Sequence, residues 1–216
     1  IRILTTLRHA AGLEVVHELV WRDGLSHVTV RTTATNCGDA PVSLELLTSF
    51  SLGGITPFAD ADAPERLWLH RFRSGWSSEG RLESAPVEAF HLDRSWTGHS
   101  VFCERFGQVG SFPSSGFFPR VLAEDRVAGV FWGAQLAWAG SWQLEMYRKD
   151  DCLCLSGGLA DREFGHWLKT LAPGESVVSP TAFLSVVRGD VATICERLNG
   201  CFDAVALPAS ERAMPI

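Results

Sequence analysis

Two carboxylates and two tryptophans are the residues whose types and spacing could bind a sugar. Asp60 and Asp62 stand two positions apart in GGITPFADADAPER, and a carboxylate accepts paired hydrogen bonds from neighbouring sugar hydroxyls. Trp68 and Trp76 both lie in LWLHRFRSGWSSEGR, where Trp68 alternates with polar residues. A tryptophan that shares a strand face with polar groups is typical of a stacking platform or an interface anchor. We therefore expect Asp60, Asp62, Trp68 and Trp76 to form the substrate-binding part of the chain.

Catalytic chemistry has weaker support in the sequence. A retaining glycosidase needs two carboxyl groups about 5–5.5 Å apart on a rigid support, and Asp60 and Asp62 are neighbours on one loop without such a support. A mutarotase-like enzyme needs a histidine and a glutamate that converge on an anomeric carbon, for which His99 and Glu104 are the candidates. The sequence also has no nucleophile elbow, P-loop, HExxH or dinucleotide fingerprint, so the enzyme classes that depend on these motifs have no support.

Composition limits the possible partners. The chain has 216 residues, a net charge of −6 and 46% hydrophobic residues, so it can fill the core of one large β domain. Basic runs are missing, which argues against nucleic acids and acidic membranes as partners. None of the six cysteines forms a CxxC pair, so we expect no metal, and nothing in the motifs implies a cofactor. No signal peptide is visible in the opening IRILTTLRHAAGLEV, and we expect a cytoplasmic protein.

The elements that must position these residues are mostly strands. Alternation with a period of two predicts strands at Leu13–Trp21, His27–Thr35 and Val42–Leu52, and further short strands follow. Residues 53–66 and 107–119 are rich in Gly and Pro and are predicted to be loops, which often carry function. One helix is predicted from Val191 to about Val205, capped by Asp190. The pattern indicates a mainly β fold, a large antiparallel β-sandwich over residues 1–188, with one C-terminal helix.

The segment GVFWGAQLAWAGSWQLEM, residues 129–146, contains three of the eight tryptophans. Its even-numbered residues are apolar on both sides of Ala-Gly-Ser, which predicts two strands joined as a hairpin. We expect the even face, with Trp132, Trp138 and Trp142, to be buried between sheets rather than to form a sugar platform. On the opposite face, Gly133 would let another element pack closely.

Four stretches taken together resemble the N-terminal β-sandwich domain of bacterial α-galactosidases of glycoside hydrolase family 36. They are TTATNCGDAPVSLELLTSFSL, FRSGWSSEGRLES, GVFWGAQLAWAGSWQLEM and WLKTLAPGESVVSPTAFLSV. Each motif is short, but the ordered set spans about residues 13–200. The resemblance implies a galactose-mutarotase-like supersandwich, and it implies that the helix at 189–207 and the residues 208–216 lead toward a (β/α)₈ barrel.

In that family the barrel carries both catalytic aspartates of a retaining mechanism, so the resemblance implies a chain that lacks them and is inactive alone. Family members assemble as oligomers in which the sandwich lends loop residues to a neighbouring active site, and Asp60, Asp62 and Trp76 would be such residues. Ser78 replaces the family's arginine two positions after Trp76, and Trp142 replaces an asparagine. These two substitutions would change the contact that the sandwich makes with a neighbouring active site and the sugar specificity of that site.

The sequence therefore predicts a non-catalytic domain that supports a barrel, mediates oligomerisation and shapes a substrate entrance. Its partners would be its own barrel, further copies of the chain and α-galactoside oligosaccharides. Two alternatives remain at this point. One is a carbohydrate-binding module that holds oligosaccharide by itself through Trp68, Trp76, Asp60 and Asp62. The other is a mutarotase-like enzyme that uses His99 and Glu104.

Overall fold

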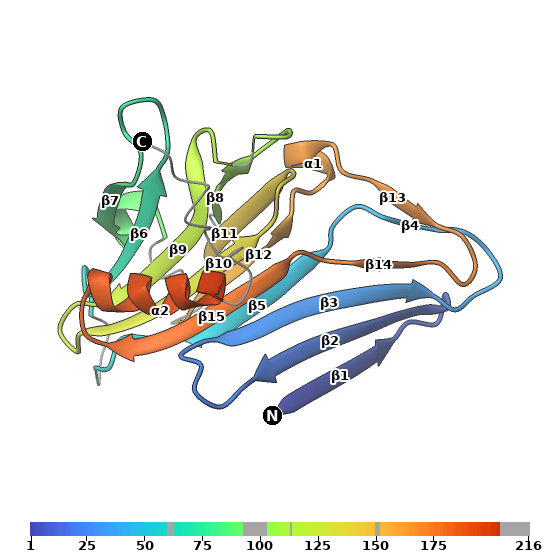
Figure 1. The fold of residues 1–216 in the computed structure, drawn as a ribbon, viewed down its shortest axis with the longest axis horizontal. Coiled ribbons are helices and arrows are strands. Elements are labelled where there is room, and N and C mark those ends of the chain that lie inside the picture. Colours follow the sequence, from blue (N-terminus) through green and yellow to red (C-terminus); the bar gives the residue numbers. More distant parts are fainter. Residues whose placement is uncertain (60–62, 93–102, 113, 150–151, 204–216) are drawn as a thin grey trace, which may run out of the picture.

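A computed structural model describes residues 1–59, 63–92, 103–112, 114–149 and 152–203. These residues form two stacked antiparallel sheets, a small two-stranded sheet and one long helix (Figure 1). The large sheet has the order β1-β2-β3-β15-β10-β9-β6-β7, with β14 paired to β3. Its nine strands are β1 (Arg2–Arg8), β2 (Leu13–Trp21), β3 (Val28–Asn36), β6 (Leu67–Arg73), β7 (Arg81–Pro86), β9 (Phe117–Asp125), β10 (Val130–Ala137), β14 (Ser176–Val178) and β15 (Thr181–Arg188).

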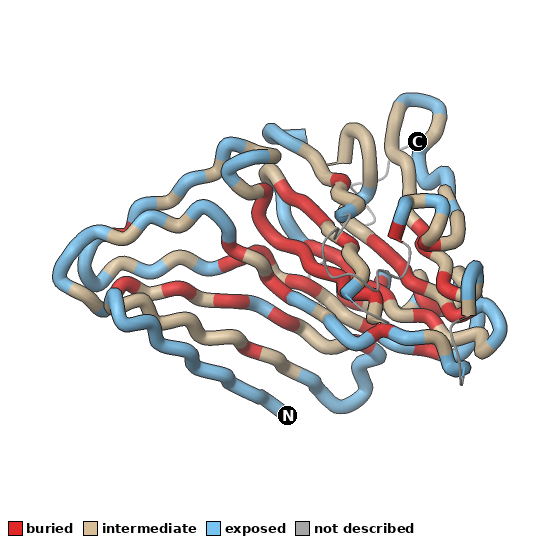
Figure 2. Tube along the Cα trace, turned by 180° about the vertical axis from the view of Figure 1, so that it is seen from behind, coloured by how far each residue is buried: buried red, intermediate tan, exposed pale blue. Residues whose placement is uncertain are grey.

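The second sheet packs against one face of the large one. It has the order β5-β12-β11-β8, and its strands are β5 (Thr48–Ile55), β8 (Cys103–Gln108), β11 (Trp142–Lys149) and β12 (Cys152–Leu159). The main core lies between the two sheets, where Phe50, Leu69 and Leu144 are among the buried side chains. Figure 2 shows the buried residues gathered along the strands of the sandwich. The predicted mainly β, antiparallel sandwich is therefore confirmed.

The outer face of the large sheet carries the helix α2 (Val191–Asp203). Its Ile194 and Leu198 are fully buried in a second cluster with Phe131 of β10. Gly133 makes this possible, because a Cβ there would lie 2.9 Å from both Ile194 Cγ1 and Leu198 Cδ1. The predicted cap is also present, since the backbone N–H of Thr193 donates to the carboxylate of Asp190 at 2.8 Å.

The predicted hairpin at 129–146 is wrong in its pairing. β10 lies in the large sheet and β11 in the small one, so residues 138–141 cross between the sheets. The even-numbered residues within β10 and β11 still face the core. A crossing places the two strands in opposite sheets with these residues facing one another, whereas a hairpin would place them side by side in one sheet. Trp142 is fully buried and Trp132 packs against the core, whereas Trp138 at the crossing is 43% exposed.

The strand predicted at 42–52 is divided into two. β4 (Val42–Leu44) pairs with β13 (Lys169–Leu171) in the small two-stranded sheet, and β5 begins at Thr48. Two short helical turns, at Val87–Phe90 and α1 (Arg162–Gly165), add to the long helix. Within the described part of the chain, no helix is long and apolar enough to cross a membrane.

Candidate functional site

β6 carries Trp68 near its first residue, and Trp76 follows in the turn beyond its last residue. The five residue steps from Trp68 to Arg73 alone span roughly 17 Å of strand, so the two tryptophans lie at opposite ends of β6. They do not form one platform. Asp60 and Asp62 lie outside the described residues, and the structure places only the chain on either side of them, which reaches β6 at Leu67.

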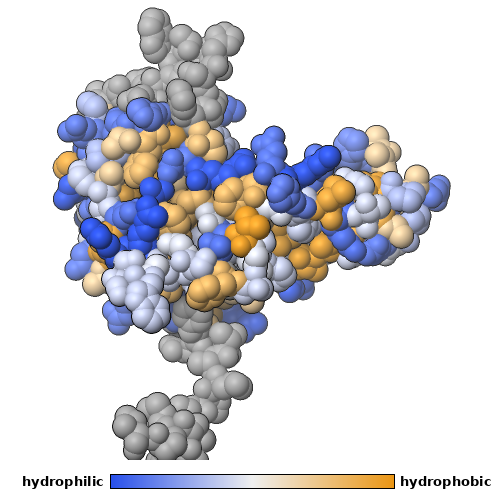
Figure 3. All heavy atoms as spheres, turned by 90° about the horizontal axis from the view of Figure 1, so that it is seen from above, coloured by the Kyte–Doolittle hydropathy of each residue, from blue (hydrophilic) through white to orange (hydrophobic). Residues whose placement is uncertain are grey.

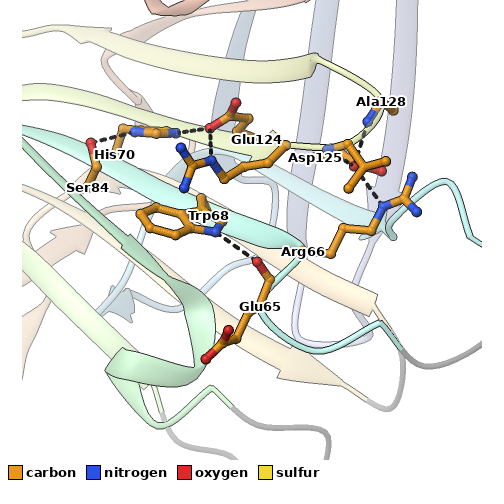
Figure 4. A network of polar contacts seen from close by, with 10 residues as sticks. Glu65, Arg66, Trp68, His70, Ser84, Glu124, Asp125 and Ala128 are labelled. Atoms are coloured by element: carbon orange, nitrogen blue, oxygen red, sulfur yellow. Dashed lines mark hydrogen bonds and ion pairs between the residues drawn. The ribbon is translucent and has the colours of Figure 1, made fainter.

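Trp68 is held in a contact network and is only partly exposed (Figure 4). Its Nε1–H donates to the carbonyl of Glu65 at 2.8 Å. The guanidinium of Arg126 lies 4.0 Å from the centroid of the indole ring, so it covers one face of the ring. Arg126 comes from the turn between β9 and β10 and thereby ties that turn to β6.

Next to Trp68 on the same strand face, His70 joins a serine and a glutamate. Its Nδ1 lies 2.8 Å from Ser84 Oγ on β7, and its Nε2 lies 3.0 Å from Glu124 Oε2 on β9 (Figure 4). These are cross-strand neighbours, because β6 pairs with both β7 and β9. The order of groups resembles a serine–histidine–acid triad.

Electrostatics argue against catalysis by this row. Burial, together with the positive charge of Arg126, lowers the pKa of His70 to about 4. Burial raises the pKa of Glu124, with Arg126 acting in the opposite direction. A general base works best with a pKa near the working pH, and the ring of His70 is 4% exposed. The neutral imidazole therefore serves as a buried hydrogen-bonding link between three strands.

Asp125 anchors the chain on both sides of residues 60–62 to the sheet. Its carboxylate accepts hydrogen bonds from Phe58 N at 2.7 Å, from Arg66 Nε at 2.8 Å and from the backbone N–H groups of Val127 and Ala128 at 3.0 and 2.9 Å. Burial by itself would raise the pKa of Asp125, but the bonds from Arg66, Ala128 and Phe58 outweigh it and lower that pKa. The predicted binding loop thus has a rigid base.

Trp76 is the most exposed large hydrophobic residue described, at 95%. It occupies the tip of the β6–β7 hairpin, whose backbone is held by Ser74 N to Gly116 O at 3.0 Å and by Gly80 N to Arg73 O at 2.8 Å. Ser77 adopts a left-handed conformation with φ 61°, and the hydroxyl of Ser78 donates to Gly75 O at 3.1 Å. The tip therefore presents an indole on an ordered turn.

Glu104, a candidate for a mutarotase-like site, forms an ion pair with an arginine of β6. Its carboxylate accepts from Arg71 Nη1 at 2.6 Å, and Arg71 also binds Glu83 at 2.8 Å. The Arg71 guanidinium lies among Phe90, Phe106 and Phe117. His99, the suggested partner of Glu104, lies outside the described residues. In the described part of the chain, no cluster of three or more His, Cys, Asp or Glu side chains could hold a metal ion.

Comparison with known proteins gives a match in structure only. No protein-family model matches the sequence, and no curated protein matches it. The galactosidase domain of the α-galactosidase–sucrose kinase AgaSK is similar, with a TM-score of 0.76 and 18% identity over 93% of this chain. The GH36 α-galactosidase AgaA from Geobacillus stearothermophilus, in complex with stachyose, has a TM-score of 0.76 and 16% identity over 93% of this chain. The α-galactosidase from Lactobacillus brevis has the same TM-score and 14% identity over 93% of this chain.

The chain has the fold of the N-terminal domain of GH36 α-galactosidases. It covers 26%, 26% and 25% of the three matched chains, so this GH36-type domain spans about a quarter of their length. At this level of identity the likeness is one of fold.

The sequence alone does not show which residues the polar side chains of β6 and its preceding turn contact. Alternation placed Arg66, Trp68 and His70 on one face, but their partners Glu124, Asp125 and Arg126 lie more than fifty positions later. The signal that could have found them is the run Glu-Asp-Arg at the end of a predicted strand, because such a run must pair with neighbouring strands.

Proposed function

We propose that this chain is the non-catalytic N-terminal domain of an α-galactosidase of family 36. Its role is to support a catalytic barrel, to mediate association of subunits and to shape the substrate entrance. The fold match over 93% of the chain supports the first part of the proposal. The parent reaction would be the retaining hydrolysis of terminal α-galactosides, in a barrel that supplies both catalytic aspartates.

The single observation that carries the interface role is the exposure of Trp76. Tryptophan is one of the three residue types enriched at interface hot spots, with tyrosine and arginine. Trp76 is 95% exposed, and the surrounding turn is fixed by backbone hydrogen bonds. A second copy or the barrel would cover it. Seen from above, hydrophobic side chains also lie in several patches between hydrophilic ones (Figure 3).

Oligomeric state tests the association role. Light scattering of the purified chain should give a mass above that of the monomer, and Trp76→Ala should shift the mass toward the monomer. The control is Trp138→Ala, which removes a 43% exposed indole from the crossing between the sheets. A chain that is monomeric at every concentration would contradict association through this domain.

Activity and sugar titration separate the alternatives. The chain alone should not hydrolyse a chromogenic α-galactoside, since the proposed catalytic pair belongs to the barrel. Calorimetric titration with galactose, melibiose and raffinose should give no saturable heat, because Trp68 and Trp76 are at opposite ends of β6. Saturable binding that is lost in Trp76→Ala would favour a binding module. Faster mutarotation of galactose that is lost in Glu104→Gln would favour a mutarotase.

A further inference from the structure

A mainly apolar pocket lies on the outer face of the large sheet, between the C-terminal half of α2 and the β6–β7 hairpin. Its volume is about 320 Å³, which suits a small organic molecule. Phe72 and Phe118 provide much of the apolar wall, and Gly80 leaves the hairpin side open. The polar members of the lining are Arg120, Gln135 and Asn199.

Arg120 is a cation held in place by two hydrogen bonds, and no carboxylate of the described residues forms an ion pair with it. Its Nε donates to Gln135 Oε1 at 2.7 Å and its Nη2 donates to Asn199 Oδ1 at 2.5 Å, so both partners are neutral amides. The guanidinium also lies 5.7 Å from the ring centroid of Phe72. Among the described residues no carboxylate pairs with Arg120, although most other arginines in the sheets do have such a partner. Nη1 remains available toward a ligand.

We propose that this pocket binds a small apolar carboxylate, such as an aryl-acetate or a short-chain fatty acid. The carboxylate would accept a charge-assisted hydrogen bond from Arg120 Nη1, and the apolar body would pack on Phe72 and Phe118. A half-buried cation is stabilised most by an anion with little other polar surface, because each additional polar group would lose its hydration in the apolar pocket. The single guanidinium and the apolar wall favour a carboxylate over a phosphate, which carries a larger charge and loses more hydration on entering an apolar pocket.

Two features make the site specific for this chemistry. Gln135 and Asn199 hold the guanidinium in place before a ligand arrives, which reduces the entropy lost on binding. Phe118 and Arg120 are two positions apart on β9, so their side chains extend from the same face of the strand. The proposal does not depend on the α-galactosidase assignment, because its probe is not a sugar and its pocket does not include Trp68 or Trp76.

Calorimetric titration of the full chain with sodium phenylacetate tests the site. Saturable binding is expected, and the neutral isostere phenylacetamide should bind at least about tenfold more weakly, a difference of about 1.4 kcal/mol. Arg120→Gln should weaken phenylacetate binding by about tenfold or more. The matched control Arg188→Gln removes the same charge from the far end of β15 and should bind phenylacetate as the wild type does.

A second variant keeps the test decisive if Arg120→Gln is poorly folded. Phe118 is 37% exposed, so Phe118→Glu should leave the fold intact. It places a carboxylate within reach of Arg120, and this internal competitor should abolish binding. The proposal would be overturned if no saturable heat appeared up to ~10 mM phenylacetate, a concentration far above the dissociation constants of ordinary ligands. Equal affinity for phenylacetamide, or unchanged binding in the folded variants, would also overturn it.

Discussion

Asp125 is the residue on which the base of the predicted binding loop depends. Asp125→Asn would turn one of its acceptor oxygens into a donor that faces existing donors, and it would leave Arg66 without its charge partner. Breaking a buried ion pair in this way costs about 3 kcal/mol. Urea unfolding should show this loss, whereas the exposed Asp39→Asn should change the free energy of unfolding by less than about 0.5 kcal/mol. A small effect of Asp125→Asn would mean that water replaces these bonds.

His70 makes a different prediction at the same scale, because its effect depends on pH. The unfolded chain binds a proton at the ordinary histidine pKa of 6.5, but the folded chain binds it only near pH 4. Stability from His70 is therefore full above pH 6.5 and is lost as the pH falls toward 4. The full difference is about 3 kcal/mol. Glu124, whose pKa is raised, works in the opposite direction as it takes up its proton.

Comparison with His70→Gln isolates this contribution. The free energy of unfolding of the wild type should fall more steeply between pH 7 and pH 4 than that of the variant. Parallel curves for the two proteins would show that His70 titrates normally in the folded state. The measurement is equilibrium urea unfolding at a series of pH values.

At the scale of elements, α2 and the strand beneath it fit together through one glycine. Gly133→Val should destabilise the protein by about 2 kcal/mol, because the added side chain meets Ile194 and Leu198. Leu198→Ala should cost about 3 kcal/mol through the cavity that it leaves. The two changes together should cost at least about 1 kcal/mol less than their sum, since the new valine fills that cavity. Thermal or urea unfolding of the four proteins measures this coupling.

The control for the helix is Glu196→Ala, because Glu196 is exposed on the same helix. It should leave stability nearly unchanged. Additive costs for Gly133→Val and Leu198→Ala would contradict the packing of α2 on β10, and the helix would then have to lie elsewhere.

The sequence shows which face of a strand is buried more readily than it shows the strand's neighbour. Alternation alone assigns the even-numbered residues of β10 and β11 to the face that packs in the core, and Gly133 to the opposite face. The partner of β11 could not be found in this way, because a hairpin and a crossing bury the same residues. Closeness in sequence is also a poor guide to closeness in space. Trp68 and Trp76 are eight positions apart, but nearly the whole length of β6 separates them.

At the scale of the molecule, the large sheet combines strands that are far apart in the chain. β3 pairs with β15 across about 150 residues of sequence, and β6 pairs with β9 across a shorter gap that includes β8 of the other sheet. Neither sheet is made from one continuous segment, so the two sheets must fold together. Such non-local pairing is typical of slow-folding β proteins.

The position of β15 has a consequence for synthesis of the protein on the ribosome. It lies between β3 and β10, so it joins β1–β3 to the four strands β10, β9, β6 and β7. When residue 180 has been added, every other strand of the large sheet already exists, but the edges of β3 and β10 that β15 will cover still lack their hydrogen-bond partners. Those edges can pair with another nascent chain until residues 181–188 emerge. Within the large sheet, β15 is therefore the strand whose synthesis covers these two open edges.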